Sequence, residues 1–256
     1  MTHLDELNGG RSAARRRPTL LGVWAHPDDE AYLAAGLMTD FVRAGGRVVV
    51  VTATRGEAGT SDPTAWPPWR LAARRERELR DSLATLGVDE VDLLGFPDGG
   101  CHRFDGTDCI AHHIRRVRPD LIVTFGPDGL TGHTDHRAVS QWTIAARDAV
   151  RPQADLWFAT VTPEFHDEWG AVNEEADFFY PDQPDTPRTP AADLVRQVML
   201  TDDVLDLKFA ALAAHGTQTA DLIELIGAAT YRRWWRTESF RRATTAAHAT
   251  VDGLAA

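Results

Sequence analysis

The chain has 256 residues, of which 43% are hydrophobic and 25% charged, a composition typical of globular proteins and not of disordered or fibrous ones. Its formal net charge of −11 argues against a nucleic-acid partner, because phosphate backbones attract basic proteins. The sequence shows neither a signal-peptide pattern nor an apolar stretch long enough to span a membrane. We therefore expect a cytoplasmic protein.

Apolar segments of strand length alternate with amphipathic segments through the first 160 residues. The expected strands are Thr19–Ala25, Arg47–Thr54, Val91–Leu94, Leu121–Phe125 and Leu156–Val161. The expected helices are Ala31–Arg43, Arg70–Leu86, Asp108–Val117 and His136–Val150. Such alternation is typical of βαβ units. It predicts an α/β protein with a Rossmann-like three-layer fold and a mostly parallel sheet.

Residues 163–190 break this alternation, because they are acidic and aromatic at first and proline-rich afterwards. We interpret them as an irregular excursion or lid. Helical periodicity returns in Asp203–Ala214 and again from Asp221. We expect a single domain over residues 1–256, with a core over 18–220 and a C-terminal helical tail over 221–256. The adjacent Trp234 and Trp235 in that tail favour internal packing or contacts in a homo-oligomer.

Four ionisable residues follow the first expected strand in the segment AHPDDE, which ends at Glu30. Buried carboxylates need a cation or a proton, and a bound divalent metal ion would compensate them. Pro27 favours a turn that brings His26 and Asp29 to the same side, with Asp28 projecting differently. Imidazole nitrogen and carboxylate oxygen are both zinc ligands. The alternative interpretation is a turn followed by an acidic first helical turn.

A second cluster, His133-Thr134-Asp135-His136, also lies between an expected strand and an expected helix. By itself it is open to the interpretation that Asp135 caps the helix. In a parallel sheet, however, strand-to-helix loops emerge at one edge, and ligands bind where the strand order reverses. If the first and fourth strands flank that point, the two clusters share one metal site.

The two clusters identify the chain as similar to the PIG-L/LmbE-like family of zinc-dependent N-deacetylases, which includes N-acetylglucosaminyl-phosphatidylinositol and mycothiol-pathway deacetylases. The resemblance runs from about Leu20 to about Gln218. Its motifs are Ala25–Glu30 (AHPDDE), Thr54–Glu57 (TxGE), Arg75–Gly87 (RxxE, then LG), Phe96–Gly99, Arg118–Asp120, His133–His136 (HxDH) and Lys208–Gln218 (Kx6HxxQ). The first and sixth motifs are specific, whereas the others are weak alone.

The resemblance implies one zinc ion per chain, or another divalent metal, held by His26, Asp29 and His136 with a position left open for water. It implies that Asp28 is the general base. His133 matches the family histidine that stabilises the tetrahedral oxyanion or protonates the leaving amine. This agrees with the chemistry of catalytic zinc sites, which keep three protein ligands and one exchangeable position.

Asp135 is expected to orient a histidine, with His133 as its partner. Arg75 and Glu78 are interpreted as a structural pair on one helix face. The chain departs from the mycothiol-pathway members at Thr131, where those proteins carry a tyrosine. It therefore lacks that phenol.

Three residues are candidates for substrate binding. Arg55 follows the second strand and can hold sugar hydroxyls or a phosphate, or else pair with Glu57. Asp98 can accept hydrogen bonds from sugar hydroxyls, or simply form a turn. The resemblance places His215 near the pocket, although a helix C-cap explains it equally well.

The sequence thus predicts a zinc-dependent hydrolase that removes an acetyl group from an amino sugar in a small glycoconjugate. Two alternatives remain open at this point. One is an amidase for thiol S-conjugates of the mycothiol type, and the other is a non-catalytic, metal-dependent sugar-binding module. The presence of Asp28 beside the ligands weighs against the binding module, since binding alone needs no second carboxylate there.

Overall fold

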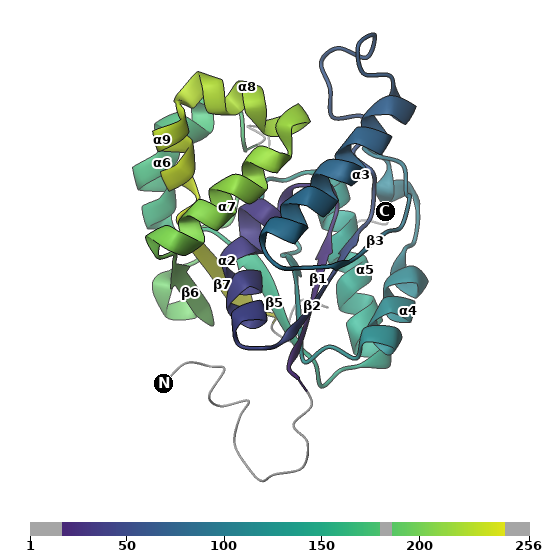
Figure 1. Cartoon of the computed structure of the whole chain (residues 1–256). Coiled ribbons are helices and arrows are strands. Elements are labelled where there is room, and N and C mark those ends of the chain that lie inside the picture. Colours follow the sequence, from purple (N-terminus) through teal and green to yellow (C-terminus); the bar gives the residue numbers. More distant parts are fainter. Residues whose placement is uncertain (1–16, 180–185, 244–256) are drawn as a thin grey trace, which may run out of the picture.

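The computed structural model describes residues 17–179 and 186–243 of the chain, and in this part a seven-stranded sheet lies between helices (Figure 1). The strands are β1 (Thr19–Trp24), β2 (Arg47–Thr52), β3 (Glu90–Leu93), β4 (Leu121–Phe125), β5 (Asp155–Thr160), β6 (Arg196–Met199) and β7 (Thr237–Arg242). The α-helices are α2 (Asp29–Arg43), α3 (Pro68–Thr85), α4 (Thr107–Val117), α5 (Thr134–Val150), α6 (Pro163–Glu175), α7 (Asp202–Ala214), α8 (Gly216–Ile226) and α9 (Ala228–Trp234).

The strand order is β3-β2-β1-β4-β5-β7-β6. Strands β1 to β5 are parallel, whereas β7 runs antiparallel to both of its neighbours. The chain builds outward from β1 to β3 on one side and from β4 to β5 on the other. The strand order therefore reverses between β1 and β4, which pair directly. This confirms the predicted fold class, and the first and fourth strands flank the point of reversal, as a shared site for the two clusters requires.

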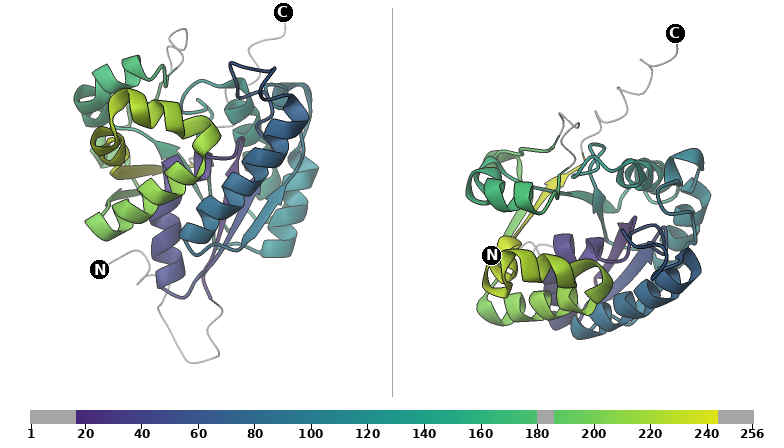
Figure 2. Two further views of the ribbon diagram at one scale, coloured as in Figure 1. Left: turned by 45° about the horizontal axis from the view of Figure 1, so that its top comes forward. Right: turned by 90° about the horizontal axis from the view of Figure 1, so that it is seen from above.

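Three layers form because the central strands are apolar on both faces. Every residue of β1 is buried, as are five of the six residues of β2, so each face needs a covering layer of helices. Helix α7 packs against both α2 and α3 on one face, and α4 packs on α5 on the other (Figure 2). No helix in the described part of the chain is long and apolar enough to cross a membrane.

The segment expected to be irregular begins with a regular helix, α6. Pro163 occupies its first turn, and the side chain of Thr162 accepts a hydrogen bond from the backbone N–H of Phe165 at 3.4 Å. Trp234 is fully buried and donates from Nε1 to Oδ1 of Asn173 in α6 at 2.8 Å. The proline-rich part of the excursion, residues 180–185, lies outside the described residues.

The C-terminal segment differs from the expected helical tail, because residues 237–242 form strand β7 inside the sheet. The strand was not predicted because it contains a charged residue, Glu238, which is buried in the fold. Glu238 accepts hydrogen bonds from the backbone N–H groups of Gly36 and Leu37 and pairs with Lys208 Nζ at 2.8 Å. The tail thereby fixes α2, which carries part of the site. Residues 244–256 of the expected tail lie outside the described residues.

Candidate metal centre and active site

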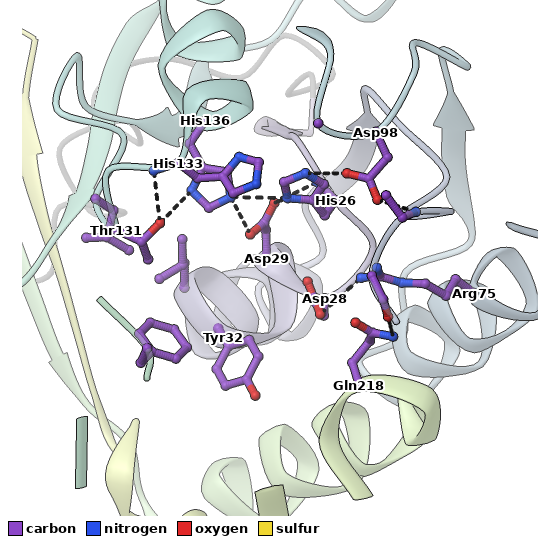
Figure 3. A pocket seen from close by; sticks show the side chains of 16 residues that line it. His26, Asp28, Asp29, Tyr32, Arg75, Asp98, Thr131, His133, His136 and Gln218 are labelled. Carbon is purple, nitrogen blue, oxygen red and sulfur yellow. Dashed lines mark hydrogen bonds and ion pairs between the residues drawn. The ribbon is translucent and has the colours of Figure 1, made fainter. Parts of the chain in front are cut away.

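A cavity of about 360 Å3 opens where β1 and β4 end, and residues of both sequence clusters, AHPDDE and HTDH, line it (Figure 3). His26, Asp28 and Asp29 come from the turn after β1 and the start of α2. His133 and His136 come from the start of α5. The remaining lining residues are Tyr32, Leu33, Ala58, Gly59, Arg75, Asp98, Gly99, Leu130, Thr131, Phe178 and Gln218.

His26, Asp29 and His136 present their ligand atoms to one another. His26 Nδ1 lies 3.2 Å from His136 Nε2 and 3.7 Å from Asp29 Oδ2, and His136 Nε2 lies 3.4 Å from Asp29 Oδ1. Atoms bound to a tetrahedral zinc ion at about 2.0–2.2 Å stand roughly 3.3–3.6 Å apart. The spacing of these three side chains therefore fits a zinc-sized ion.

The hydrogen bonds of the two imidazoles leave the required nitrogen atoms free to coordinate. His136 Nδ1 lies 2.9 Å from the carbonyl oxygen of Gly129, which requires a proton on Nδ1 and leaves a lone pair on Nε2. His26 Nε2 faces Asp98 Oδ1 at 3.1 Å and Asp135 Oδ2 at 3.4 Å, which places its proton on Nε2. Carboxylates and carbonyls orient metal-binding histidines in this way.

Two groups among the described residues hold potential ligand atoms that all lie within 4.8 Å of one another: His26 with His133 and His136, and His26 with Asp98 and Asp135. The distances from Asp29 to the two histidines end on different oxygens, Oδ2 for His26 and Oδ1 for His136. In the second group, both oxygens of Asp135 already accept backbone N–H bonds, from Gly99 at 2.7 Å and from Cys101 at 2.9 Å. Asp135 is therefore suited to orient His26. Asp29 accepts the backbone N–H groups of Ala25 and His26 on Oδ2 alone, while its Oδ1 faces His136 Nε2, so the site with Asp29 is the better candidate.

The electrostatics of the site favour a cation. Burial by itself lowers the pKa of His26, but hydrogen bonds to Asp135 and Asp98 and the charge of Asp29 raise it to about 10. Burial and the neighbouring charge of His26 lower the pKa of His136 to about 3, so this imidazole is neutral. The field that stabilises a proton on His26 also attracts a divalent ion, which would replace that proton.

Asp28 is held beside the ligands in a strained backbone conformation, with a φ of 124°. Its backbone N–H donates to Glu30 Oε2 at 3.1 Å, and its Oδ2 pairs with Nη2 of Arg75 at 3.2 Å. Burial raises the pKa of Asp28 to about 6, although the charge of Arg75 opposes that rise. Asp28 is thus mostly ionised at pH 7 and basic enough to take up a proton.

Arg75 is a site residue that the sequence interpretation missed. It was expected to pair with Glu78, but Glu78 instead pairs with Arg74 and accepts from Thr217. The Arg75 guanidinium is buried and donates to the carbonyl oxygens of Pro27 at 2.6 Å and Gly56 at 2.9 Å. The only signal in the sequence was the weak RxxE motif, because nothing local predicts a contact 47 residues away.

Replacing Arg75 with Met is expected to lower the free energy of unfolding by about 3 kcal/mol, because it leaves the partly buried Asp28 carboxylate and two carbonyl groups without their donor. Chemical denaturation measures this change. Arg80 on the same helix pairs with Glu76 but is half exposed, so Arg80→Met is the matched control and should cost about 0.5 kcal/mol. Equal losses in the two variants would contradict the assigned role of Arg75.

His133 is neutral and directs an N–H toward the cavity. Burial and the neighbouring charge of His26 lower its pKa to about 4. Its Nδ1 accepts the backbone N–H of Asp135 at 3.1 Å, so in the neutral ring the proton lies on Nε2. His133 is therefore equipped to donate a hydrogen bond to an oxyanion. Of the two roles that the resemblance implied, this geometry favours the first.

The carboxylate of Asp135 faces a different histidine from the one expected. Asp135 was expected to pair with His133, but its carboxylate faces Nε2 of His26 at 3.4 Å, and its backbone N–H donates to Nδ1 of His133. The reason is that Asp135 is fully buried beneath the loop after β3, where Gly99 and Cys101 hold it.

The three candidate substrate residues have different positions. Asp98 lines the cavity and accepts the backbone N–H of Ala58 at 2.8 Å, and the positively charged His26 lowers its pKa against the effect of burial. Arg55 does not line the cavity and pairs with Glu76 at 3.0 Å on the surface, not with Glu57. His215 is fully buried behind the site.

His215 Nε2 lies 3.1 Å from Glu30 Oε1, and both side chains have no exposed surface. Burial opposes protonation of His215, but the hydrogen bond to Glu30 raises its pKa above the ordinary value. Because Glu30 also receives the backbone N–H of Asp28, this pair supports the turn that carries Asp28. His215 is thus placed as a supporting residue and not in contact with substrate.

Together these features define an α/β protein with a candidate metal-binding active site at the carboxyl edge of its sheet. Residues 21–147 match the PIG-L family, described as GlcNAc-PI de-N-acetylase. A protein of Mycobacterium sp. (strain KMS) described as 1D-myo-inositol 2-acetamido-2-deoxy-alpha-D-glucopyranoside deacetylase is 31% identical over 238 residues, covering 78% of this chain and 74% of the relative. The chain therefore belongs to the PIG-L family of metal-dependent deacetylases.

Solved structures share the fold at lower identity. N,N'-diacetylchitobiose deacetylase from Pyrococcus horikoshii is 19% identical with a TM-score of 0.62, covering 88% of this chain and 83% of that one. A 4-carboxy-2-hydroxymuconate hydratase from Pseudomonas putida KT2440 is 17% identical with a TM-score of 0.57, covering 89% and 96%. The second similarity shows that the fold alone does not decide the reaction.

Proposed function

We propose that the protein hydrolyses the amide bond between an acetyl group and an amino sugar in a small glycoconjugate, with zinc or another divalent ion held by His26, Asp29 and His136. The observation that carries the proposal is the position of the Asp28 carboxylate in the same cavity as these three residues. Membership in a deacetylase family supports the same reaction. Because relatives act on an N-acetylglucosamine conjugate of inositol, we infer a substrate of that class.

A divalent metal ion, when bound, supplies Lewis-acid polarisation of the amide carbonyl and lowers the pKa of water. The chain's own groups carry the proton transfers. Asp28 is mostly ionised, so it can accept the proton of the attacking water and later deliver it to the leaving amine. His133 donates from Nε2 to the oxygen that becomes negative as the carbonyl carbon turns tetrahedral. Asp98 and the side-chain oxygen of Gln218 line the cavity and can accept hydrogen bonds from sugar hydroxyls, while Gln218 Nε2 donates to the carbonyl oxygens of Gly59 and Thr217.

The test is an assay of acetate and free amine with the zinc-loaded protein. The substrates are N-acetylglucosamine and its conjugates with inositol and other aglycones. The proposal predicts equal amounts of acetate and amine, and loss of turnover after removal of the metal by a chelator, with recovery when zinc returns. Zinc-dependent binding of these sugars without hydrolysis would instead support a binding module. Preferential cleavage of amides in thiol S-conjugates would support the amidase alternative.

A further inference from the structure

The active-site cavity has two chemically different walls on opposite sides of the candidate metal ligands. Asp98, Arg75 and Gln218 lie on one side of the group formed by His26, Asp29 and His136, whereas Thr131 and Tyr32 lie on the other (Figure 3). Leu33 and Leu130 are the chain neighbours of Tyr32 and Thr131, and the Phe178 ring lies 5.5 Å from that of Tyr32. We call Tyr32, Leu33, Leu130 and Phe178 the apolar wall.

Strained backbone conformations occur at or next to this wall and at Asp28, the proposed general base. Among the residues that the structure describes, only Asp28, Arg118, Leu130 and Asp177 are non-glycine residues with positive φ. Leu130 has a φ of 61° and lies in the wall itself, while Asp177, with a φ of 47°, directly precedes Phe178. Leucine has no polar side chain to stabilise this conformation locally, so the surroundings must hold it. Such strain is typical of functional positions.

Leu130 and Phe178 are each held in place by specific contacts. The backbone N–H of Leu130 donates to Asp128 Oδ1 at 2.7 Å, and its side chain is 1% exposed. Phe178 follows a left-handed residue after α6, and its N–H returns to the carbonyl of Asn173 at 3.1 Å, a helix-ending hydrogen bond. The Phe178 ring packs against Trp234 and Trp235 with centroid distances of 5.0 Å. The wall is therefore rigid.

The two sides of the cavity suit the two halves of an N-acyl amino sugar. Sugar hydroxyls need hydrogen-bond partners, which Asp98 and Gln218 provide, whereas the carbon chain of an acyl group needs only apolar contact. Tyr32 presents its ring, because its hydroxyl is engaged by that of Tyr231 at 2.6 Å. The buried rings of Trp234 and Trp235 pack against Phe178 in this wall.

We propose that the apolar wall is the acyl subsite, and that Leu130 and Phe178 determine which acyl groups are accepted, favouring acetyl over longer chains. This inference rests on the proposed amide hydrolysis. A rigid apolar wall discriminates by size, because each methylene that does not fit costs roughly 10-fold or more in kcat/KM. Leu130 and Phe178 act on specificity by contact with the acyl chain, without taking part in proton transfer.

The test compares kcat/KM for N-acetyl, N-propionyl and N-butyryl glucosamine conjugates with one aglycone. The wild type should lose roughly 10-fold or more from acetyl to propionyl and roughly 100-fold or more from acetyl to butyryl, and Phe178→Ala and Leu130→Ala should each raise the butyryl-to-acetyl ratio at least about 10-fold. Leu225, an exposed apolar residue of α8, provides the control Leu225→Ala, which should keep the wild-type ratio. Phe178 is only partly buried, so we expect Phe178→Ala to fold. The proposal can therefore still be tested with this variant if Leu130→Ala does not fold.

Different results distinguish failure of the acyl subsite from failure of the proposed amide hydrolysis. If the variants hydrolyse all three substrates with an unchanged ratio, or alter the preference for the aglycone and not for the acyl group, the acyl subsite is overturned and the deacetylase function stands. If the wild type releases no carboxylate from any of the three substrates, both proposals fail.

Discussion

Replacement of Asp28 by Asn is expected to lower kcat by about 10²- to 10⁴-fold, the usual contribution of a general base. Asparagine tolerates the positive φ of this position and can still accept the hydrogen bond from Arg75, so the turn should keep its shape. It cannot take up a proton from water. The variant should therefore bind metal and substrate normally while losing turnover.

The measurement is steady-state acetate release together with metal analysis of the same sample. The control is Glu30→Gln, which also removes one carboxylate charge two residues along the chain. Glu30 accepts the backbone N–H of Asp28 but does not line the cavity. Its effect on kcat should be much smaller than that of Asp28→Asn. Unchanged turnover in Asp28→Asn would exclude the proposed base.

Replacement of His136 by Ala is expected to abolish activity and to lower zinc affinity by more than about 100-fold, the upper range for loss of a residue that merely orients a ligand. A three-ligand site cannot replace a missing imidazole when its neighbours are fixed, as they are at the starts of α2 and α5. Zinc titration by calorimetry or by a competing chelator measures the change.

His133 provides the matched comparison, because it is an imidazole three residues before His136 whose ring stands 5.0 Å from that of His136. In the proposed site His133 donates to the oxyanion and does not hold the metal. His133→Ala should therefore keep zinc affinity near the wild-type value and lose kcat by about 10²- to 10³-fold. A loss of zinc in His133→Ala with retention in His136→Ala would reverse the two assignments.

The fold class, and the proximity of the AHPDDE and HTDH segments at one edge of the sheet, could be predicted from the sequence. The uninterrupted apolar runs of β1 and β2 and their alternation with helices predict a parallel sheet, and this sheet places AHPDDE beside HTDH. Strand β7 was not predictable in the same way, because its Glu238 is buried only through partners on α2 and α7. A charged residue in a short segment carries no local sign of those partners.

The positions of single side chains were less predictable for the same reason. Adjacent spacing favoured Asp135 with His133 and Arg75 with Glu78, but the carboxylate and the guanidinium reach across the sheet edge to His26 and Asp28. His215 was predicted to lie near the pocket, and it lies behind the pocket through its contact with Glu30. Contacts between distant loops depend on the packed fold, which local periodicity does not specify.

The most direct measurement is an anomalous difference map at the zinc edge from crystals of the zinc-loaded protein. The account predicts one strong peak bounded by His26 Nδ1, Asp29 and His136 Nε2, the atoms that already stand 3.2–3.7 Å apart. A peak on the other side of the His26 ring, between Nε2 and the carboxylates of Asp98 and Asp135, would contradict it.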